Sequence, residues 1–152
     1  METTPRSPGI SHPAARLQGD AMKALDTSAL LALLEGDRGA KGLLQRLRGV
    51  EVATTEINLL ELGYAAAKGP VRDRVARRAI LTRLRRKLTV LPLDDKAVEE
   101  ANTRLAKGAG MPPLRLAMLS ILEVNGCEEL VSSETNPLQG KWRFKQVRFS
   151  KR

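Results

Sequence analysis

The sequence predicts an α/β fold in which helices cover both faces of a short parallel sheet. Short apolar segments that suit buried strands alternate along the chain with longer segments of helical periodicity. No tight hairpin signal joins neighbouring strand candidates, so the pattern favours parallel pairing. The 152 residues suit one domain that can bury a core of useful size. The expected architecture is therefore a three-layer α/β/α sandwich.

Four short apolar segments are the strand candidates: Met22–Leu25, Val50–Ala53, Leu88–Leu93 and Leu130–Val131. Near the end of the chain, Trp142 and Phe144 alternate with basic residues, which leaves two alternatives. The rings pack on one face of a last strand, or they belong to an arm that stacks on RNA bases. We favour a packed strand up to about Phe144 and a free or RNA-bound arm beyond it.

Helical periodicity separates these strands, with helices expected over 29–34, 40–48, 55–68, 71–87, 95–107 and 114–125. Thr27 or Ser28 is expected to cap the first helix, because hydroxyl oxygens accept from free amides there. Thr54 or Thr55 is expected to start the third helix for the same reason. Gly126 is expected to close the last helix in the left-handed conformation that glycine adopts freely.

The sequence divides into a flexible leader (1–21), a folded domain (22–140) and a basic C-terminal tail (141–152). The leader is rich in proline and glycine and lacks periodicity, and Met22 is as plausible a start as Met1. No apolar run approaches the ~20 residues that cross a bilayer, and the first residues lack a signal-peptide core. With one cysteine and no possible internal disulfide, the chain is expected to be cytoplasmic, without a membrane partner.

The charge of the chain predicts an anionic partner. Lys and Arg number 26 against 17 acids, a formal charge of +9, which favours nucleic acid or an anionic surface as partner. The alternatives are a charge that aids solubility, an adaptation to hot or acidic surroundings, and, for the basic helix, a solvated face. The residues expected to contact RNA phosphates are Arg72, Arg74, Arg77, Arg78, Arg85, Arg86, Lys87, Lys141, Arg143, Lys145 and Arg148.

Three acids are the candidate chemical groups. Asp26 follows the first strand, Glu134 follows the fourth, and Glu61 lies among apolar residues of a helix. The carboxyl ends of parallel strands share one edge of a sheet, where sites of α/β proteins gather. Carboxylates brought together there repel one another unless a cation such as Mg²⁺ or Mn²⁺ is bound between them. Such a cation activates water and stabilises charge on a phosphate, although solvated helix-end acids are the alternative.

Four segments resemble the motifs of PIN-domain proteins, in particular VapC-type toxin ribonucleases. Residues 25–34 (LDTSALLALL) resemble the opening motif, and residues 55–63 (TEINLLELG) resemble the second acidic motif, with Glu61 in the metal-facing place. Residues 91–94 (LPLD) are similar to the strand and helix start that follow, and residues 129–134 (ELVSSE) to the last motif. The resemblance spans about residues 22–136.

This resemblance implies an α/β/α sandwich, an acidic site for Mg²⁺ or Mn²⁺ and cleavage of single-stranded RNA. It also implies an antitoxin partner and a homodimer. Asp26, Glu61 and Glu134 would be the metal ligands and catalytic residues, Glu134 having a longer arm than the usual aspartate or asparagine. The family's third acid is expected to fall on Leu116, which cannot bind a metal.

Because Leu116 stands where the family has its third acid, three functions remain open. The chain is a metal-dependent endoribonuclease with a degenerate acidic site, or a catalytically inactive PIN-fold protein that binds RNA or associates with the ribosome. The third function is a protein that only neutralises an antitoxin. Glu56 could replace the missing ligand only if its helix were rotated, since the five residues to Glu61 span about 140° around a helix.

Overall fold

The computed structural model describes residues 22–36, 38–69 and 71–149, without the side chains of residues 38, 71 and 72. The expected leader, residues 1–21, lies outside the described residues. In the described part of the chain, five strands form one sheet in the order β3-β2-β1-β4-β5, and every pairing is parallel. The strands are β1 (Met22–Leu25), β2 (Glu51–Thr55), β3 (Thr89–Leu91), β4 (Glu129–Ser132) and β5 (Lys145–Arg148).

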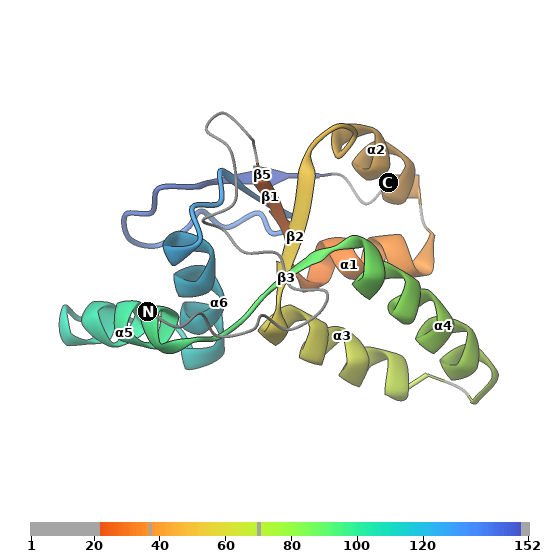
Figure 1. Cartoon of the computed structure of the whole chain (residues 1–152), viewed down its shortest axis with the longest axis horizontal. Coiled ribbons are helices and arrows are strands. Elements are labelled where there is room, and N and C mark those ends of the chain that lie inside the picture. The colour runs from red at the N-terminus through yellow and green to blue at the C-terminus, as the bar shows by residue number, and fades with distance from the viewer. Residues whose placement is uncertain (1–21, 37, 70, 150–152) are drawn as a thin grey trace, which may run out of the picture.

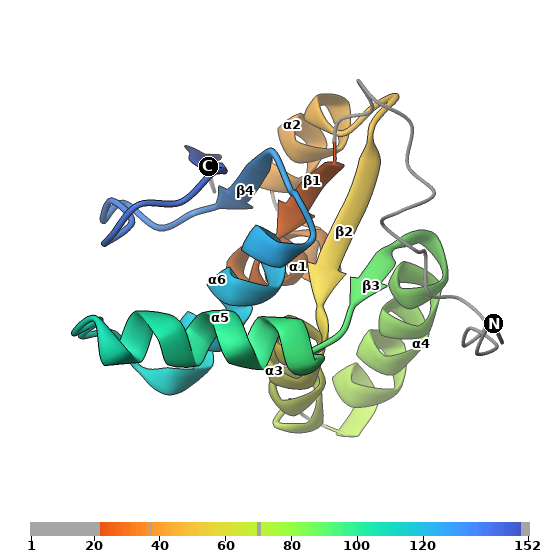
Figure 2. The ribbon, with the colours of Figure 1, turned by 60° about the vertical axis from the view of Figure 1, so that its left-hand side comes forward.

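Helices cover both faces of this sheet (Figures 1 and 2). They are α1 (Thr27–Glu35), α2 (Arg38–Arg46), α3 (Glu56–Ala67), α4 (Val71–Lys87), α5 (Asp95–Ala106) and α6 (Pro113–Val124). Helices α5 and α6 pack on one face, and α1, α2 and α4 pack on the other, with α3 at the end between them (Figure 2). The predicted α/β/α sandwich with a short parallel sheet is confirmed.

Two aliphatic cores hold the three layers together. One core packs α6 residues such as Leu119 and Leu122 against Met22 and Leu130 of the sheet. The other packs α1, α2, α3 and α4 against the opposite face, and Leu30 of α1 is fully buried in it. Because consecutive strand residues point to opposite faces, β4 supplies Leu130 to one core and Val131 to the other. Burial on both faces explains why consecutive residues such as Ala24 and Leu25 of β1, or Leu130 and Val131 of β4, are all apolar.

The start of α1 differs from the sequence prediction in a way that bears on the site. Neither Thr27 nor Ser28 caps this helix, since Asp26 is the N-cap and its carboxylate accepts from the Ala29 amide at 3.0 Å. Aspartate is as good an N-cap as serine, and its negative charge suits the helix N-terminus. Thr55 caps α3 as predicted, and Gly126 has the predicted positive φ of 68°.

The C-terminal segment also differs from the prediction. The strand begins after Phe144 rather than ending near it, and β5 pairs with β4 along its whole length. Phe144 and Phe149 are both buried, on opposite cores. Residues 145–148 are thus part of the sheet, and Phe149 after them is buried, so the prediction of an arm beyond Phe144 is wrong for residues 145–149. Strand β5 forms because β4 would otherwise present an unpaired edge.

No helix in the described ranges is long and apolar enough to cross a membrane.

Candidate functional site

The strand order places a crevice between β1 and β4. The strands that follow β1 in the chain are added first on one side of it, as β2 and β3, and then on its other side, as β4 and β5. At such a switch point the connections leave toward opposite faces and open a crevice at the carboxyl ends of the strands. Asp26 directly follows β1, and Ser133 and Glu134 follow β4. The backbone amide of Asp26 donates to the carbonyl of Val131 at 3.3 Å, which fixes the two ends side by side.

A pocket of about 260 Å³ lies at this crevice, and all three predicted acids line it. Asp26 comes from the end of β1, Glu61 from α3 and Glu134 from the segment after β4. Asp26 is 6% exposed, whereas Glu61 and Glu134 are exposed. The sequence positions of these acids span 108 residues from first to last, so only the fold brings them together.

Hydroxyl and amide donors hold Asp26 in place. One carboxylate oxygen accepts from the Ser28 hydroxyl at 2.5 Å and from the Ala29 amide. The other accepts from the hydroxyl of Ser132, the last residue of β4. The Ser132 hydroxyl also accepts from the amide of Glu134 at 3.0 Å, which ties the Glu134 backbone to Asp26 through one side chain. Three donors therefore fix the orientation of this nearly buried carboxylate.

A second chain of hydrogen bonds holds Glu61. Its carboxylate accepts from the hydroxyl of Thr27, the first residue of α1. That hydroxyl accepts in turn from the side-chain amide of Asn58 at 3.0 Å, and Asn58 is 2% exposed. Thr55 completes the chain, since its hydroxyl donates to the Asn58 side chain at 2.8 Å. The fixed Thr27 and Asn58 side chains therefore aim an otherwise exposed carboxylate into the pocket.

Glu56 does not belong to the pocket. Its carboxylate accepts from the backbone amide of Leu93 at 2.8 Å, and it is not among the pocket-lining residues. This contact joins the start of α3 to the segment between β3 and α5. Glu56 therefore has a structural role. This agrees with the expectation that Glu56 and Glu61 point in different directions from the same helix.

The structure corrects the position at which an acid is missing. Leu116 is 1% exposed and packed inside the protein, so it does not face the pocket. Arg115 faces it instead, together with Leu114 and Met118 of the same helix. Residues 115 and 118 lie on one side of a helix, while the side chain of residue 116 points about 100° away from that of residue 115. The first turn of α6 thus contributes a guanidinium to a pocket of three carboxylates.

Sequence reasoning overlooked Arg115, although a signal for it was present. The buried face of α6 is marked by three leucines at helical spacing, Leu116, Leu119 and Leu122. Residue 115 therefore lies at the edge of this face and not within the core. Arg115 forms no ion pair with any described carboxylate. Its side chain is half-buried, and its charge remains available to an anion that enters the pocket.

The oxygen donors of the pocket fit a hard divalent cation. Mg²⁺ prefers carboxylate ligands, keeps several waters and needs only one or two carboxylates from the protein. Among the described residues, no group of three metal-binding side chains stands close enough to hold an ion directly. Arg115 also adds a positive charge that repels a cation. The pocket lining thus has the oxygen donors that a hydrated divalent cation prefers, but the described residues do not form a direct three-ligand metal site.

The basic residues of α4 fall into two groups. Arg74 donates to the carbonyl of Ala67 at 3.2 Å, and Arg77 pairs with Glu35 at 3.0 Å, so both stabilise helix contacts. The side chain of Arg72 lies outside the described part of the structure. The exposed members, for which the structure gives no ion pair, are Arg78, Arg83, Arg85, Arg86 and Lys87.

The predicted RNA contacts of the C-terminal segment lie at the other edge of the sheet. Lys141, Lys145 and Arg148 are exposed there, and Arg143 pairs with Glu123 at 3.2 Å although its side chain is 85% exposed. Helix α4 leads into β3, at the opposite edge of the sheet from β5, and the C-terminal strand and α4 lie on opposite sides of the molecule in Figure 2. The structure therefore does not bring the two basic groups together.

Comparisons with known proteins agree with this fold. The family model described as PIN domain matches residues 23–120, which include Asp26, Glu61 and Arg115. The chain belongs to the PIN-domain family. This PIN-domain protein has no match in a comparison with curated proteins.

Solved structures of toxin–antitoxin proteins share the fold of this PIN-domain protein. VapBC2 from Rickettsia felis, bound to a promoter DNA fragment, matches with a TM-score of 0.70 at 16% identity over 85% of this chain and 99% of that chain. VapBC-5 from Mycobacterium tuberculosis matches with a TM-score of 0.61 at 23% identity, covering 84% and 98%. VapC20 from the same organism, a sarcin–ricin loop cleaving toxin, matches with a TM-score of 0.57 at 20% identity, covering 75% and 91%.

Proposed function

We propose that this PIN-domain protein is a metal-dependent endoribonuclease of VapC character that acts on single-stranded RNA. The observation that carries the proposal is the convergence of Asp26, Glu61 and Glu134 on one pocket at the switch point of the sheet. One Mg²⁺ or Mn²⁺ between these carboxylates would activate water and stabilise the charge that builds on the phosphate. The cleavage of RNA by VapC20, a protein of similar fold, supports the same assignment.

The side chains around the pocket have separate roles in this proposal. Asp26 is the best-held acid, because the backbone of α1 and the hydroxyls of Ser28 and Ser132 fix its orientation. Thr27 positions Glu61. Arg115 offers donors to a phosphate oxygen, since its fork of N–H groups suits phosphate and no described acid pairs with it. The repulsion between Arg115 and the cation makes the site degenerate, with weak metal binding.

The test is cleavage of single-stranded RNA by the purified protein in Mn²⁺, compared with the Asp26→Asn variant. Asparagine is as good an N-cap as aspartate, so this variant keeps α1 capped while it removes the charge. We expect Mn²⁺-dependent cleavage that Asp26→Asn abolishes. Asp95→Asn is the matched control, because Asp95 is an exposed acid in the first turn of α5 and outside the pocket. Cleavage that survives Asp26→Asn contradicts the assignment, and RNA binding without cleavage in wild type would favour the RNA-binding or ribosome-associated alternative.

A protein partner of the antitoxin type is the second part of the proposal. Leu60 and Tyr64 are 73% and 63% exposed, and they lie one turn apart on α3, the helix that carries Glu61. Exposed apolar side chains of this size suit a protein contact, and a partner covering them would also cover the approach to Glu61. Structures of similar fold are VapBC complexes. We expect a protein of the antitoxin type to co-purify with this protein and to suppress cleavage, and cleavage unaffected by any co-purified protein would count against a paired antitoxin.

A further inference from the structure

A second cavity, of about 340 Å³, lies between the end of α5 and the segment that leads to β5. Trp142 lines it together with Arg104 and Lys107, and Gly110 and Met111 contribute to its wall. None of these residues lines the carboxylate pocket. The volume falls within the range of about 300–1,000 Å³ that is usual for small-molecule sites. This cavity is called the Trp142 cavity below.

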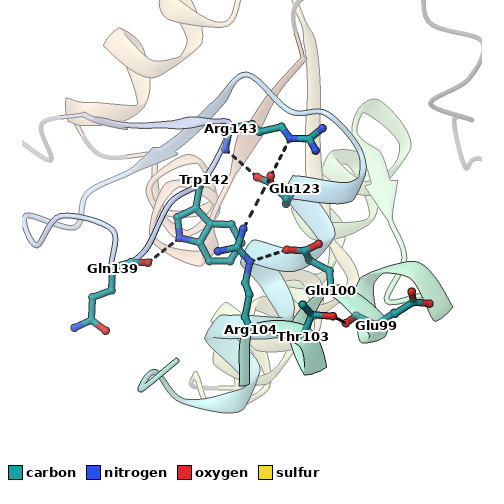
Figure 3. Close-up of polar contacts among 8 residues, drawn as sticks. All are labelled: Glu99, Glu100, Thr103, Arg104, Glu123, Gln139, Trp142 and Arg143. Carbon is teal, nitrogen blue, oxygen red and sulfur yellow. Dashed lines mark hydrogen bonds and ion pairs between the residues drawn. The ribbon is translucent and has the colours of Figure 1, made fainter. Parts of the chain in front are cut away.

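The cavity presents a planar cation fixed on an aromatic ring (Figure 3). The guanidinium of Arg104 lies 3.4 Å from the centre of the Trp142 ring. Its Nε pairs with Glu100 at 2.7 Å, and its terminal nitrogen lies 4.0 Å from Glu123, so two carboxylates set its plane. The indole N–H of Trp142 donates to the carbonyl of Gln139 at 2.8 Å, which fixes the ring as well. Fixed aromatic rings and guanidinium planes are the surfaces on which nucleobases stack.

A third cavity, of about 250 Å³, has walls in common with both the Trp142 cavity and the carboxylate pocket. It shares Met111 and Gln139 with the Trp142 cavity, and it shares Arg115 and Glu134 with the carboxylate pocket. The three hollows are therefore neighbours, and together they mark a path along the start of α6. Lys107 lies at one end of this path and Arg115 at the other, where each can contact a phosphate.

We propose that the Trp142 cavity binds a nucleobase of the single-stranded RNA whose backbone crosses the carboxylate pocket. This proposal rests on the proposed function, because the RNA that enters the path is the substrate of that pocket. The base stacks on the Arg104–Trp142 pair, and the neighbouring phosphates follow the third cavity toward Arg115. Stacking accepts any base, since every base has a π face, so the cavity adds affinity and sets the position of the strand.

Trp142 is the only tryptophan of the chain, so its fluorescence reports this cavity alone. The experiment uses the full chain carrying Asp26→Asn, without divalent metal, titrated with a short single-stranded RNA. Fluorescence anisotropy of a dye on the RNA measures total binding, and tryptophan emission measures occupancy of the cavity. We expect both signals to saturate at the same RNA concentration. Inorganic polyphosphate, which has the charge without the bases, should leave the tryptophan emission unchanged.

A substitution separates stacking from charge. Arg104→Lys keeps the positive charge but removes the planar group, and we expect it to weaken RNA binding about tenfold. Arg46→Lys, at an exposed arginine of α2, is the matched control and should bind as wild type does. Thermal unfolding of each variant checks that Arg104→Lys is folded.

The outcomes distinguish this proposal from the proposed function. RNA binding without a change in tryptophan emission would overturn the nucleobase site and leave the nuclease assignment intact. Wild-type affinity in folded Arg104→Lys would overturn it as well. No RNA binding in anisotropy, together with no cleavage by the wild-type protein, would overturn both proposals.

Discussion

Two neighbouring substitutions on α6 test which residue replaces the missing acid. Leu116 is 1% exposed and Arg115 lines the carboxylate pocket, so the same new carboxylate has opposite effects at the two positions. Arg115→Asp places a fourth acid in the pocket. Leu116→Asp places a charge in the interior, where no pocket residue can use it.

The volume of the pocket gives the size of the effect at Arg115. A sphere of about 260 Å³ has a radius of about 4 Å, so a charge on the wall lies roughly 6 Å from a central ion when side-chain width is added. At that distance a unit charge and a divalent ion interact by about 1.4 kcal/mol even at the dielectric constant of water. Arg115→Ala should therefore raise Mn²⁺ affinity at least about tenfold, and Arg115→Asp about a hundredfold.

At Leu116 the effect is on stability. Truncation of a buried leucine to alanine costs about 2.7–5 kcal/mol, and an uncompensated buried carboxylate adds several kcal/mol more. The sum approaches the whole stability of a typical domain, about 5–15 kcal/mol. Leu116→Asp should thus be largely unfolded or aggregated.

The assay combines calorimetric titration with Mn²⁺, single-turnover RNA cleavage and thermal unfolding of the wild type and the variants at 115 and 116. Arg115→Ala is the control that removes the positive charge without adding an acid. Unchanged Mn²⁺ affinity in folded Arg115→Asp would refute the reasoning. So would a folded Leu116→Asp protein that gains activity, since that residue would then have to face the pocket.

Three further predictions concern the supporting residues. Thr27→Val keeps the shape of the side chain but removes the hydroxyl that links Glu61 to Asn58, so the single-turnover cleavage rate should fall about tenfold, and the buried Asn58 amide that loses an acceptor should cost about 1–3 kcal/mol of stability; an unchanged cleavage rate in the folded variant would make Thr27 structural only. Arg86→Gln should make the salt dependence of RNA binding shallower by about 0.7 in log–log slope, and an identical slope across a salt series would leave α4 as a solvated face. Leu60→Ser should shift the sedimentation coefficient toward that of a monomer if α3 also forms a homodimer, whereas monomeric wild-type protein would exclude that dimer.

Periodicity and strand composition were sufficient to predict most of the fold. Apolar segments such as Met22–Leu25 formed strands because burial on both faces of a parallel sheet requires such segments. Strand β5 was harder to predict, because its residues (KQVR) are mostly polar and it forms by pairing with the edge of β4. Pairing between distant segments leaves no local signal in a sequence, so the order β3-β2-β1-β4-β5 also required the structure.

The candidate site was predictable in part. The positions of Asp26 and Glu134 after strands, together with the family resemblance, indicated that the acids converge, and all three line one pocket. Which α6 residue faces that pocket depends on a helical rotation of about 100° per residue, so an error of one position exchanged Arg115 for Leu116. The network through Ser132 and Asn58 was not predictable, because hydroxyls and amides at strand and helix ends usually serve as caps.

The most direct measurement of the central claim is anomalous diffraction from a crystal soaked in Mn²⁺. The account predicts one manganese peak in the pocket, within reach of the carboxylates of Asp26, Glu61 and Glu134, and no peak there in a crystal of Asp26→Asn. A pocket without manganese at high Mn²⁺ concentration, or manganese bound only at acids outside the pocket, would contradict the claim that these three side chains form a metal-binding nuclease site.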